Sequence, residues 1–288
     1  KTAYEIRNCD WSSDVCSSDL EPLRPWKREQ LGGGYDVSSW IESQSLISAS
    51  AVIAVSHGMR NDIVSTYPHV DPERVVVVHN GIDLDTYRPN DTRVAASLGI
   101  PQEKPFVLFV GRITRQKGLI HLIRAAHHFA EGATLVLCAS SPDTPQIITE
   151  ITSAVADLQA SRGRDAVIWI REHVARETLV SLLTEATIFA CPSVYEPLGI
   201  VNLEAMACET AVVASAVGGI PEVVVDGETG LLVPFDPSDT TNFERSFAHA
   251  VNELLANPER TTMMGSRGRA RASAQFGWDS IARQTMDV

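Results

Sequence analysis

The sequence predicts an α/β protein built on a doubly wound parallel sheet. From residue 104 onward, short apolar runs alternate regularly with amphipathic segments, which is the pattern of repeated strand–helix units. The 288 residues, of which 44% are hydrophobic and 21% charged, suffice for one large or two modest globular domains. A shorter alternation precedes residue 90, so we expect one complete Rossmann-like domain and the C-terminal part of a second.

The net charge and the cysteine content indicate which partners and which compartment to expect. The formal net charge of −12 argues against a nucleic-acid or anionic-membrane partner. No apolar run reaches the length of a membrane span. The five cysteines lack paired spacing and are typical of free thiols in a reducing compartment. We therefore expect a cytoplasmic protein.

The first twenty residues have neither helical nor strand periodicity. Residues 10–20 resemble a reading frame through a common sequencing-adaptor oligonucleotide. Such a segment has to be set apart before the fold is considered. We expect residues 1–20 to be foreign, with the natural chain beginning near residue 20 or 21.

Residues 21–94 are predicted to be the remnant of an N-terminal domain with its linker. A helix over 36–50 should precede a strand at 51–55, and Ser56 should cap a helix over 58–67. A buried β-branched strand follows at 75–78, and Asn80-Gly81 is a turn signal. Because this remnant lacks most of a sheet, we expect apolar surface to remain partly exposed on Trp40, Ile41 and residues 75–78.

Residues 95–275 are predicted to form the complete domain. The expected strands are 106–110, 134–138, 166–170, 188–191, 211–214 and 230–233, and the expected helices between them are 117–129, 146–160, 176–185 and 198–208. Two further helices are expected over 241–276, and the three arginines from Arg267 to Arg271 should form a solvated face there. Residues 276–288 should begin a final helix.

Two glutamates stand eight residues apart where a strand meets a helix. Glu196 follows the predicted strand, and Glu204 lies about two turns into a helix that Pro197 should start. Ligands of open α/β sheets bind off the carboxyl ends of strands, and a helix N-terminus attracts anions. A nucleotide diphosphate sugar fits this layout, with its anionic middle on residues 199–201 and a hydroxylated end at each glutamate.

A second motif follows the first strand of this domain. Gly111 allows a close backbone turn, and Arg112 and Lys117 supply the fork and the point charge that suit a diphosphate. The structural alternative is a pair of solvated surface cations. No G-x-G-x-x-G opens a helix, which argues against a dehydrogenase.

These motifs resemble those of retaining glycosyltransferases of family 4, which have the two-domain GT-B fold. The resemblance rests on the Glu-x7-Glu pair and on residues 110–118, 79–83 and 217–222 in the same order. The EPLRPWK run at 21–27, followed by residues 32–35, narrows it to the actinobacterial glycogen synthases. The resemblance implies that Glu196 contacts sugar hydroxyls and Glu204 the ribose. It also implies that a group of backbone amides contacts the phosphates or sugar: those of Leu198, Gly199, Ile200 and Val201.

The implied reaction moves glucose from ADP-glucose, or a similar donor, to an α-glucan or glucose-1-phosphate with retention. We expect Arg112, Lys117 and Glu196 to serve catalysis, without a cofactor or metal, and the Asp83-x-Asp85 pair to be a turn. The acceptor surface belongs to the first domain in this family, so we expect the chain alone not to catalyse transfer. A nucleotide-sugar epimerase and a non-catalytic donor-binding fragment remain alternatives, and the oligomeric state stays open.

Overall fold

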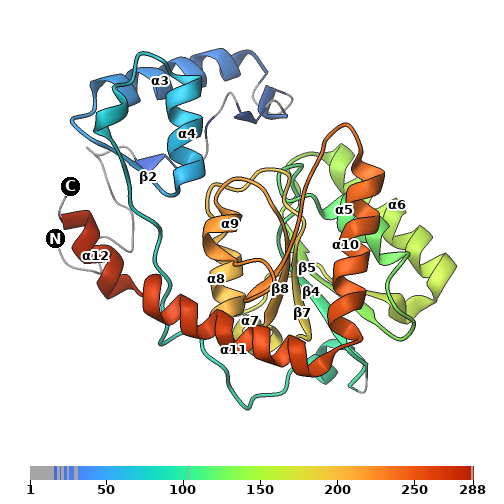
Figure 1. Ribbon diagram of the computed structural model, residues 1–288. Coiled ribbons are helices and arrows are strands. Elements are labelled where there is room, and N and C mark those ends of the chain that lie inside the picture. Colours follow the sequence, from blue (N-terminus) through green and yellow to red (C-terminus); the bar gives the residue numbers. More distant parts are fainter. Residues whose placement is uncertain are drawn as a thin grey trace.

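The computed structural model describes residues 16–17, 20, 23–24, 26–28, 32–102, 104–286 and 288. Its strands form two wholly parallel sheets, one of six strands in the order β6-β5-β4-β7-β8-β9 and one of three in the order β1-β2-β3. The two sheets lie in separate units that the chain links near residue 80 (Figure 1). The predicted α/β fold class is confirmed.

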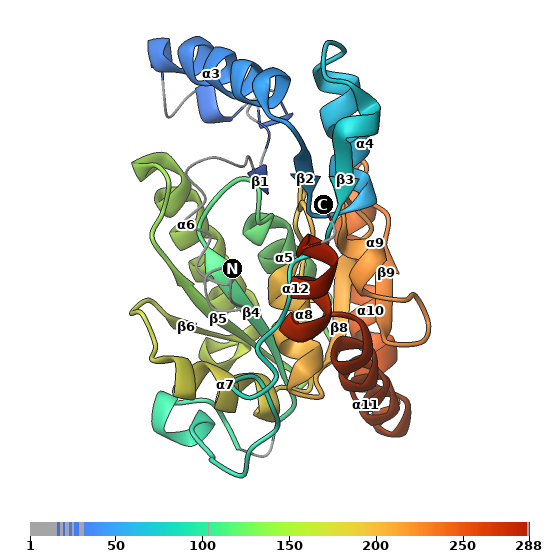
Figure 2. The same cartoon turned by 90° about the vertical axis from the view of Figure 1, so that its left-hand side faces the viewer.

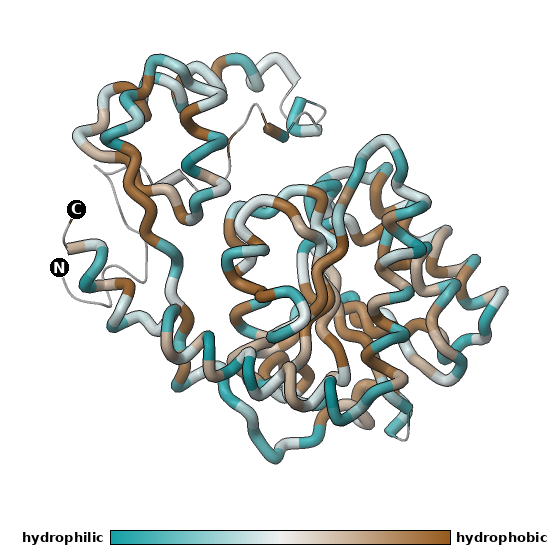
Figure 3. Tube along the Cα trace, in the orientation of Figure 1, coloured by the Kyte–Doolittle hydropathy of each residue, from teal (hydrophilic) through white to brown (hydrophobic). Residues whose placement is uncertain are grey.

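The larger sheet has the six expected strands. They are β4 (Phe106–Arg112), β5 (Thr134–Ser140), β6 (Val167–Ile170), β7 (Ile188–Cys191), β8 (Ala211–Ser215) and β9 (Gly230–Val233). β4 runs two residues beyond its predicted end, because Gly111 and Arg112 pair with Ala139 and Ser140 of β5. Every residue of β7 and β8 is buried, as parallel strands covered on both faces must be, and they form the apolar centre of Figure 3.

Helices cover both faces of this sheet. One apolar cluster joins it to α5 (Leu119–Ala126), α6 (Pro145–Arg162) and α10 (Thr240–Leu255). A second cluster joins the opposite face to α7 (Arg176–Glu185), α8 (Ile200–Ala207) and α9 (Ile220–Val223). α11 (Pro258–Gln275) then crosses to the smaller unit (Figure 1). Short 3-10 helices are η2 (Gly32–Gly34), η3 (Pro72–Arg74), η4 (Ala95–Leu98) and η5 (Arg164–Ala166).

Two helices begin later than predicted. α5 starts at Leu119 and α8 at Ile200, because the preceding Gly118 and Gly199 are left-handed, with φ of 62° and 96°. Pro197 is therefore in the loop before α8 and not at its first position, and Leu198 is also outside the helix. The loops before α5 and α8 therefore stay non-helical up to these glycines. Their polar groups lie at the edge of the sheet.

The strand order contains one switch point. From β4 the chain winds outward to β5 and β6, then returns to β7 beside β4 and winds the other way to β8 and β9. The loops that follow β4 and β7 therefore leave the same edge of the sheet side by side. Ligands of doubly wound folds bind at this place.

The smaller unit holds β1 (Cys16–Ser17), β2 (Val52–Ala54), β3 (Val75–Val77), α3 (Tyr35–Ser48) and α4 (His57–Thr66). Ser56 caps α4 as predicted and accepts the amide of Met59 at 2.9 Å. β1, from the segment expected to be foreign, pairs with β2. Trp40 and Ile41 are 64% and 52% exposed, as expected. The expected exposure of residues 75–78 is wrong for Val75 and Val78, which are 3% and 5% exposed.

The chain end returns to the linker between the units. α12 (Trp278–Met286) continues from α11 toward the smaller sheet in both Figure 1 and Figure 2. The amide of Ile82 donates to the carbonyl of Phe276 at 2.7 Å, and the Trp278 ring packs against Gly81. One apolar cluster continues from the smaller sheet to α8 of the larger unit. No helix in the part of the chain that the structure describes is long and apolar enough to cross a membrane.

Candidate functional site

Backbone contacts lock together the two loops at the switch point. The amide of Val194 donates to the carbonyl of Gln116 at 2.9 Å, and the amide of Lys117 donates to the hydroxyl of Thr114 at 3.2 Å. A Cβ on Gly118 would lie 2.0 Å from the carbonyl oxygen of Pro192, so only glycine allows this approach. These backbone contacts therefore fix the relative positions of the side chains on the two loops.

Lys117 and Glu196 form an ion pair across the switch point. Lys117 Nζ lies 2.7 Å from Glu196 Oε2, and the side chains are 22% and 9% exposed. The hydroxyl of Ser193 donates to the same carboxylate oxygen at 3.1 Å. A pair so little exposed is held in one geometry and is costly to break from one side. The ion pair therefore provides a cation, Lys117, and a fixed carboxylate, Glu196, at the wall of a cavity.

A cavity of about 240 Å³ opens at this pair, and we call it the first cavity. Its wall includes the uncapped N-terminus of α8, whose first amides have no partner within the helix. Val55 and Asn80 from the smaller unit close its other side. The predicted site residues on this wall are Arg112, Lys117, Glu196, Leu198, Gly199, Ile200 and Val201. Leu198 is only 1% exposed, so it offers backbone rather than side chain.

A second cavity, of about 420 Å³, adjoins the first at Arg112, which lines both. The Arg112 side chain is 66% exposed, and its Nη2 lies 2.7 Å from Asp143 Oδ1. Gly111 also lines the second cavity, together with Tyr87 of the linker and Arg176 of α7. The wall is completed by Val110, Cys138, Ser140, Glu172, His173, Val174 and Leu179. The two cavities together make an elongated site with a cation at its middle.

Glu204 stands behind the wall of the second cavity. Burial raises the pKa of its carboxyl group, while a hydrogen bond from Tyr87 and the charge of Arg176 act in the opposite direction. Burial and the neighbouring Glu204 carboxylate both raise the pKa of Tyr87. The three residues therefore form a connected group next to the cavity. Tyr87 belongs to no motif, so the sequence gives no signal for its part in the site.

The loop at Gly218-Gly219 supports the site from behind. Gly218 and Gly219 line neither cavity. The amide of Gly219 donates to the carbonyl of Glu196 at 2.9 Å. A Cβ on Gly219 would come within 2.3 Å of the Pro197 carbonyl oxygen. The loop thus fixes the backbone that carries Glu196.

Two other sequence features have simple structural roles. Asp83 accepts the amides of Asp85 and Thr86, each at 3.2 Å, and so closes the turn that was expected there. Among the residues that the structure describes, no group of three His, Cys, Asp or Glu side chains could hold a metal ion. Ser141, in the loop after β5, is a non-glycine residue with a left-handed φ of 53°. It takes the backbone shape that glycine would allow.

Glu204→Gln is expected to stabilise the folded chain at neutral pH. A carboxyl whose folded pKa is raised favours the folded state while protonated, and this contribution is lost as the pH rises from the unfolded value of 4.5 through the raised folded pKa. Glutamine keeps an acceptor for Tyr87 without the charge. The gain in unfolding free energy should therefore grow with pH in urea titrations. If the difference in unfolding free energy between Glu204→Gln and wild type did not change with pH, burial would not raise the pKa of Glu204.

Comparison with known proteins agrees with this architecture. A family model described as glycosyl transferases group 1 matches residues 90–271, and one described as Glycosyltransferase Family 4 matches residues 20–86. The chain is 57% identical to the alpha-maltose-1-phosphate synthase of Mycolicibacterium smegmatis, over 95% of this chain and 71% of that protein. It is 37% identical to the D-inositol 3-phosphate glycosyltransferase of Kineococcus radiotolerans, over 86% of this chain and 58% of that protein.

Solved structures show the same fold. Sucrose-phosphate synthase from Thermosynechococcus elongatus matches with a TM-score of 0.76 at 29% identity, over 94% of this chain and 65% of that one. Anabaena HepE, solved in complex with UDP-glucose, matches with a TM-score of 0.78 at 22% identity, over 94% and 70% of the two chains, and shows the fold alone. The neighbours are GT-B glycosyltransferases. The chain therefore belongs to the group 1 glycosyltransferases, a family of transferases with the GT-B fold.

Proposed function

We propose that this chain binds a nucleotide sugar, ADP-glucose or a similar donor, across the two cavities. In a protein of the length of its relatives, it would transfer glucose with retention to glucose-1-phosphate or an α-glucan. The observation that carries the proposal is Arg112, which lies at the junction of the cavities. Lys117 and the α8 N-terminus lie on one side of it, and Tyr87 with Glu204 on the other.

The layout assigns each part of the donor to a group of the site. The diphosphate lies at Arg112, Lys117 and the amides of residues 199–201, where the charge of a helix N-terminus adds to the two cations. The sugar hydroxyls meet Glu196 in the first cavity. The ribose lies at the part of the second cavity where Tyr87 hydrogen-bonds Glu204, and the base lies in the same cavity.

The chemistry that these groups support is departure of a nucleoside diphosphate. Negative charge develops on the leaving phosphate, and the two cations that line the first cavity, Arg112 and Lys117, would stabilise it there. Lys117 is held by Glu196 before the donor arrives. We assign no covalent nucleophile and no metal or cofactor to the site.

The names of the most similar relatives support glucose-1-phosphate as the acceptor. Three of them are named alpha-maltose-1-phosphate synthase, one at 57% identity and two at 53%. Addition of one glucosyl unit to glucose-1-phosphate gives a maltose 1-phosphate. The α-glucan remains the second acceptor, and the two differ in product size.

The test is a calorimetric titration of the chain with ADP-glucose and with UDP-glucose. We expect saturable binding, tighter for ADP-glucose, with Kd between about 1 μM and 1 mM, the usual range of KM values. The sugar recovered after incubation with donor alone should be unchanged, since an epimerase would alter it without an acceptor. Absence of saturable binding for both donors would contradict the proposal. Product analysis on a protein of the relatives' length, with each acceptor offered separately, identifies the acceptor.

A further inference from the structure

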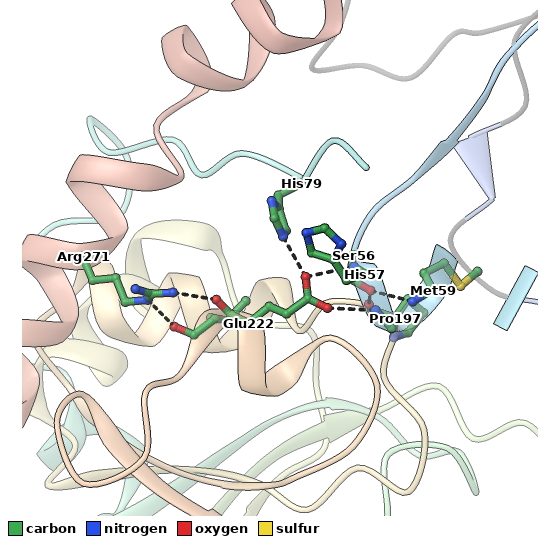
Figure 4. A network of polar contacts seen from close by, with 9 residues as sticks. Ser56, His57, Met59, His79, Pro197, Glu222 and Arg271 are labelled. Atoms are coloured by element: carbon green, nitrogen blue, oxygen red, sulfur yellow. Dashed lines mark hydrogen bonds and ion pairs between the residues drawn. The ribbon is translucent and has the colours of Figure 1, made fainter. Parts of the chain in front are cut away.

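Glu222 on α9 bonds to the other unit of the molecule. Its Oε2 and Oε1 accept the amides of His57 and Gly58, each at 2.9 Å, in the first turn of α4. His79 Nε2 lies 3.0 Å from the same Oε2. Figure 4 shows the Glu222 carboxylate between His57 and His79, and both of these residues lie outside the larger unit.

The partners of Glu222 are the free amides that every helix has at its start. Ser56 caps the third of them, Met59, at 2.9 Å, so Glu222 completes the cap of α4 from about 165 residues away in sequence. Partial burial of Glu222 opposes its ionisation, but the bonds from His57, Gly58 and His79 outweigh it and lower the pKa of the carboxyl group. The contact is thus charge-assisted and stronger than a neutral one.

Ser56 carries this contact on to the donor site. Its hydroxyl donates to the carbonyl of Pro197 at 2.6 Å, and Pro197 directly follows Glu196. Ser56 is completely buried. The position of α4 therefore determines where this hydroxyl holds the loop that carries Glu196 and leads to the α8 N-terminus.

Glycines allow α4 and the loop before α9 to pack in close backbone contact. A Cβ on Gly58 would lie 2.9 Å from the carbonyl carbon and oxygen of Gly218, and a Cβ on Gly219 would lie 2.8 Å from Ser56 Cβ. On the other side of α9, Arg271 of α11 donates to the carbonyls of Glu222 at 2.7 Å and Val223 at 2.9 Å. The C-terminal end of α9 is therefore held by Arg271 on one side, while the Glu222 side chain extends to α4 on the other (Figure 4).

We propose that Glu222 is a positioning residue for the donor site, acting through α4 and Ser56 on the loop at Pro197. This inference rests on the proposed function, since it concerns the site that the donor would occupy. Glu222 touches no donor atom in this account. It sets the loop by holding α4 against the larger unit.

The experiment compares Glu222→Gln and Ser56→Ala with the wild-type chain. ADP-glucose affinity is measured at a temperature well below the Tm of every variant, and hydrogen exchange is followed at the amides of His57 and Gly58. Glutamine cannot accept with both terminal atoms, so exchange at these amides should rise about tenfold or more in Glu222→Gln. Each single variant should bind ADP-glucose roughly three- to tenfold more weakly. Exposed Glu259→Gln, which removes the same charge at the start of α11, should change neither.

The double variant distinguishes positioning from general weakening. Glu222 and Ser56 act on the loop through the same contacts. We therefore expect the Glu222→Gln/Ser56→Ala double variant to bind ADP-glucose as tightly as the single variant with the lower affinity. Losses that multiply, or affinities within twofold of wild type despite faster exchange, would overturn the positioning role while the proposed function stands. A wild-type chain that binds no nucleotide sugar would overturn the proposed function and this role with it.

Discussion

Lys117→Ala is expected to remove most of the donor binding of this chain and most of the turnover of the longer enzyme. The substitution deletes a cation at the proposed diphosphate position and leaves the Glu196 carboxylate, 9% exposed, without its ion-pair partner. Both effects act in the same direction, since the remaining charge repels phosphate. We expect a loss of ten- to a thousandfold, or about 1.4–4 kcal/mol, in affinity or kcat. Calorimetry and steady-state kinetics measure it.

Arg115→Ala is the matched control for this experiment. Arg115 lies two residues before Lys117 in the same loop, but it pairs with Glu150 at 2.6 Å with its side chain 45% exposed. It lines a different cavity, on the other side of the loop. An exposed ion pair contributes little to stability, so we expect the donor affinity and kcat of Arg115→Ala to lie within about twofold of wild type. Equal losses in the two variants would show that net charge, and not the placement of Lys117, controls binding.

The strands and most helices could be predicted from the sequence because repeated βα units have a strong local pattern. Short apolar runs such as 134–138, placed between amphipathic segments, favour buried parallel strands, and the loops that follow parallel strands lie at one edge of the sheet. This is why the predicted site residues at 111–117 and 196–201 lie along two adjoining cavities. Local pattern suffices where the structure is regular.

The starts of α5 and α8 could not be predicted in this way. Gly118 turns left-handed where it meets the Pro192 carbonyl, and a Cβ on Gly199 would lie 2.6 Å from the Asn202 side chain. These are contacts in three dimensions, and the helical periodicity of 198–208 gives no sign of them. The sequence therefore predicted helix where the backbone first makes a tight turn.

Long-range polar contacts were also beyond sequence reasoning. The Glu222 partners His57 and Gly58 and the Ser56 partner Pro197 are more than 140 residues away. The expectation of a solvated arginine face is wrong for two of the three arginines. Arg269 donates to the carbonyl of Ala207, and Arg271 donates to the carbonyls of Glu222 and Val223. A charged residue on an amphipathic helix has the same sequence signature whether it meets water or a neighbouring carbonyl.

Gly218→Ala is expected to be among the most damaging single-methyl substitutions in the chain. Gly218 has a φ of 52°, and a Cβ there would lie 1.9 Å from the carbonyl oxygen of Glu196. Left-handed backbone costs a side chain about 1–2 kcal/mol, and forced overpacking adds about 1–3 kcal/mol. We expect a loss of about 2–5 kcal/mol in unfolding free energy, measured by urea titration, together with weaker donor binding because the Glu196 backbone must move.

Gly227→Ala separates these two contributions. Gly227 is also left-handed, with a φ of 76°, but nothing lies within 4 Å of where its Cβ would be. It should show only the backbone cost of about 1–2 kcal/mol and should leave nucleotide-sugar affinity unchanged. The difference between the two variants measures the contact between Gly218 and the Glu196 carbonyl. Similar losses in both variants would mean that the loop at Gly218 can move away from the Glu196 carbonyl without further cost.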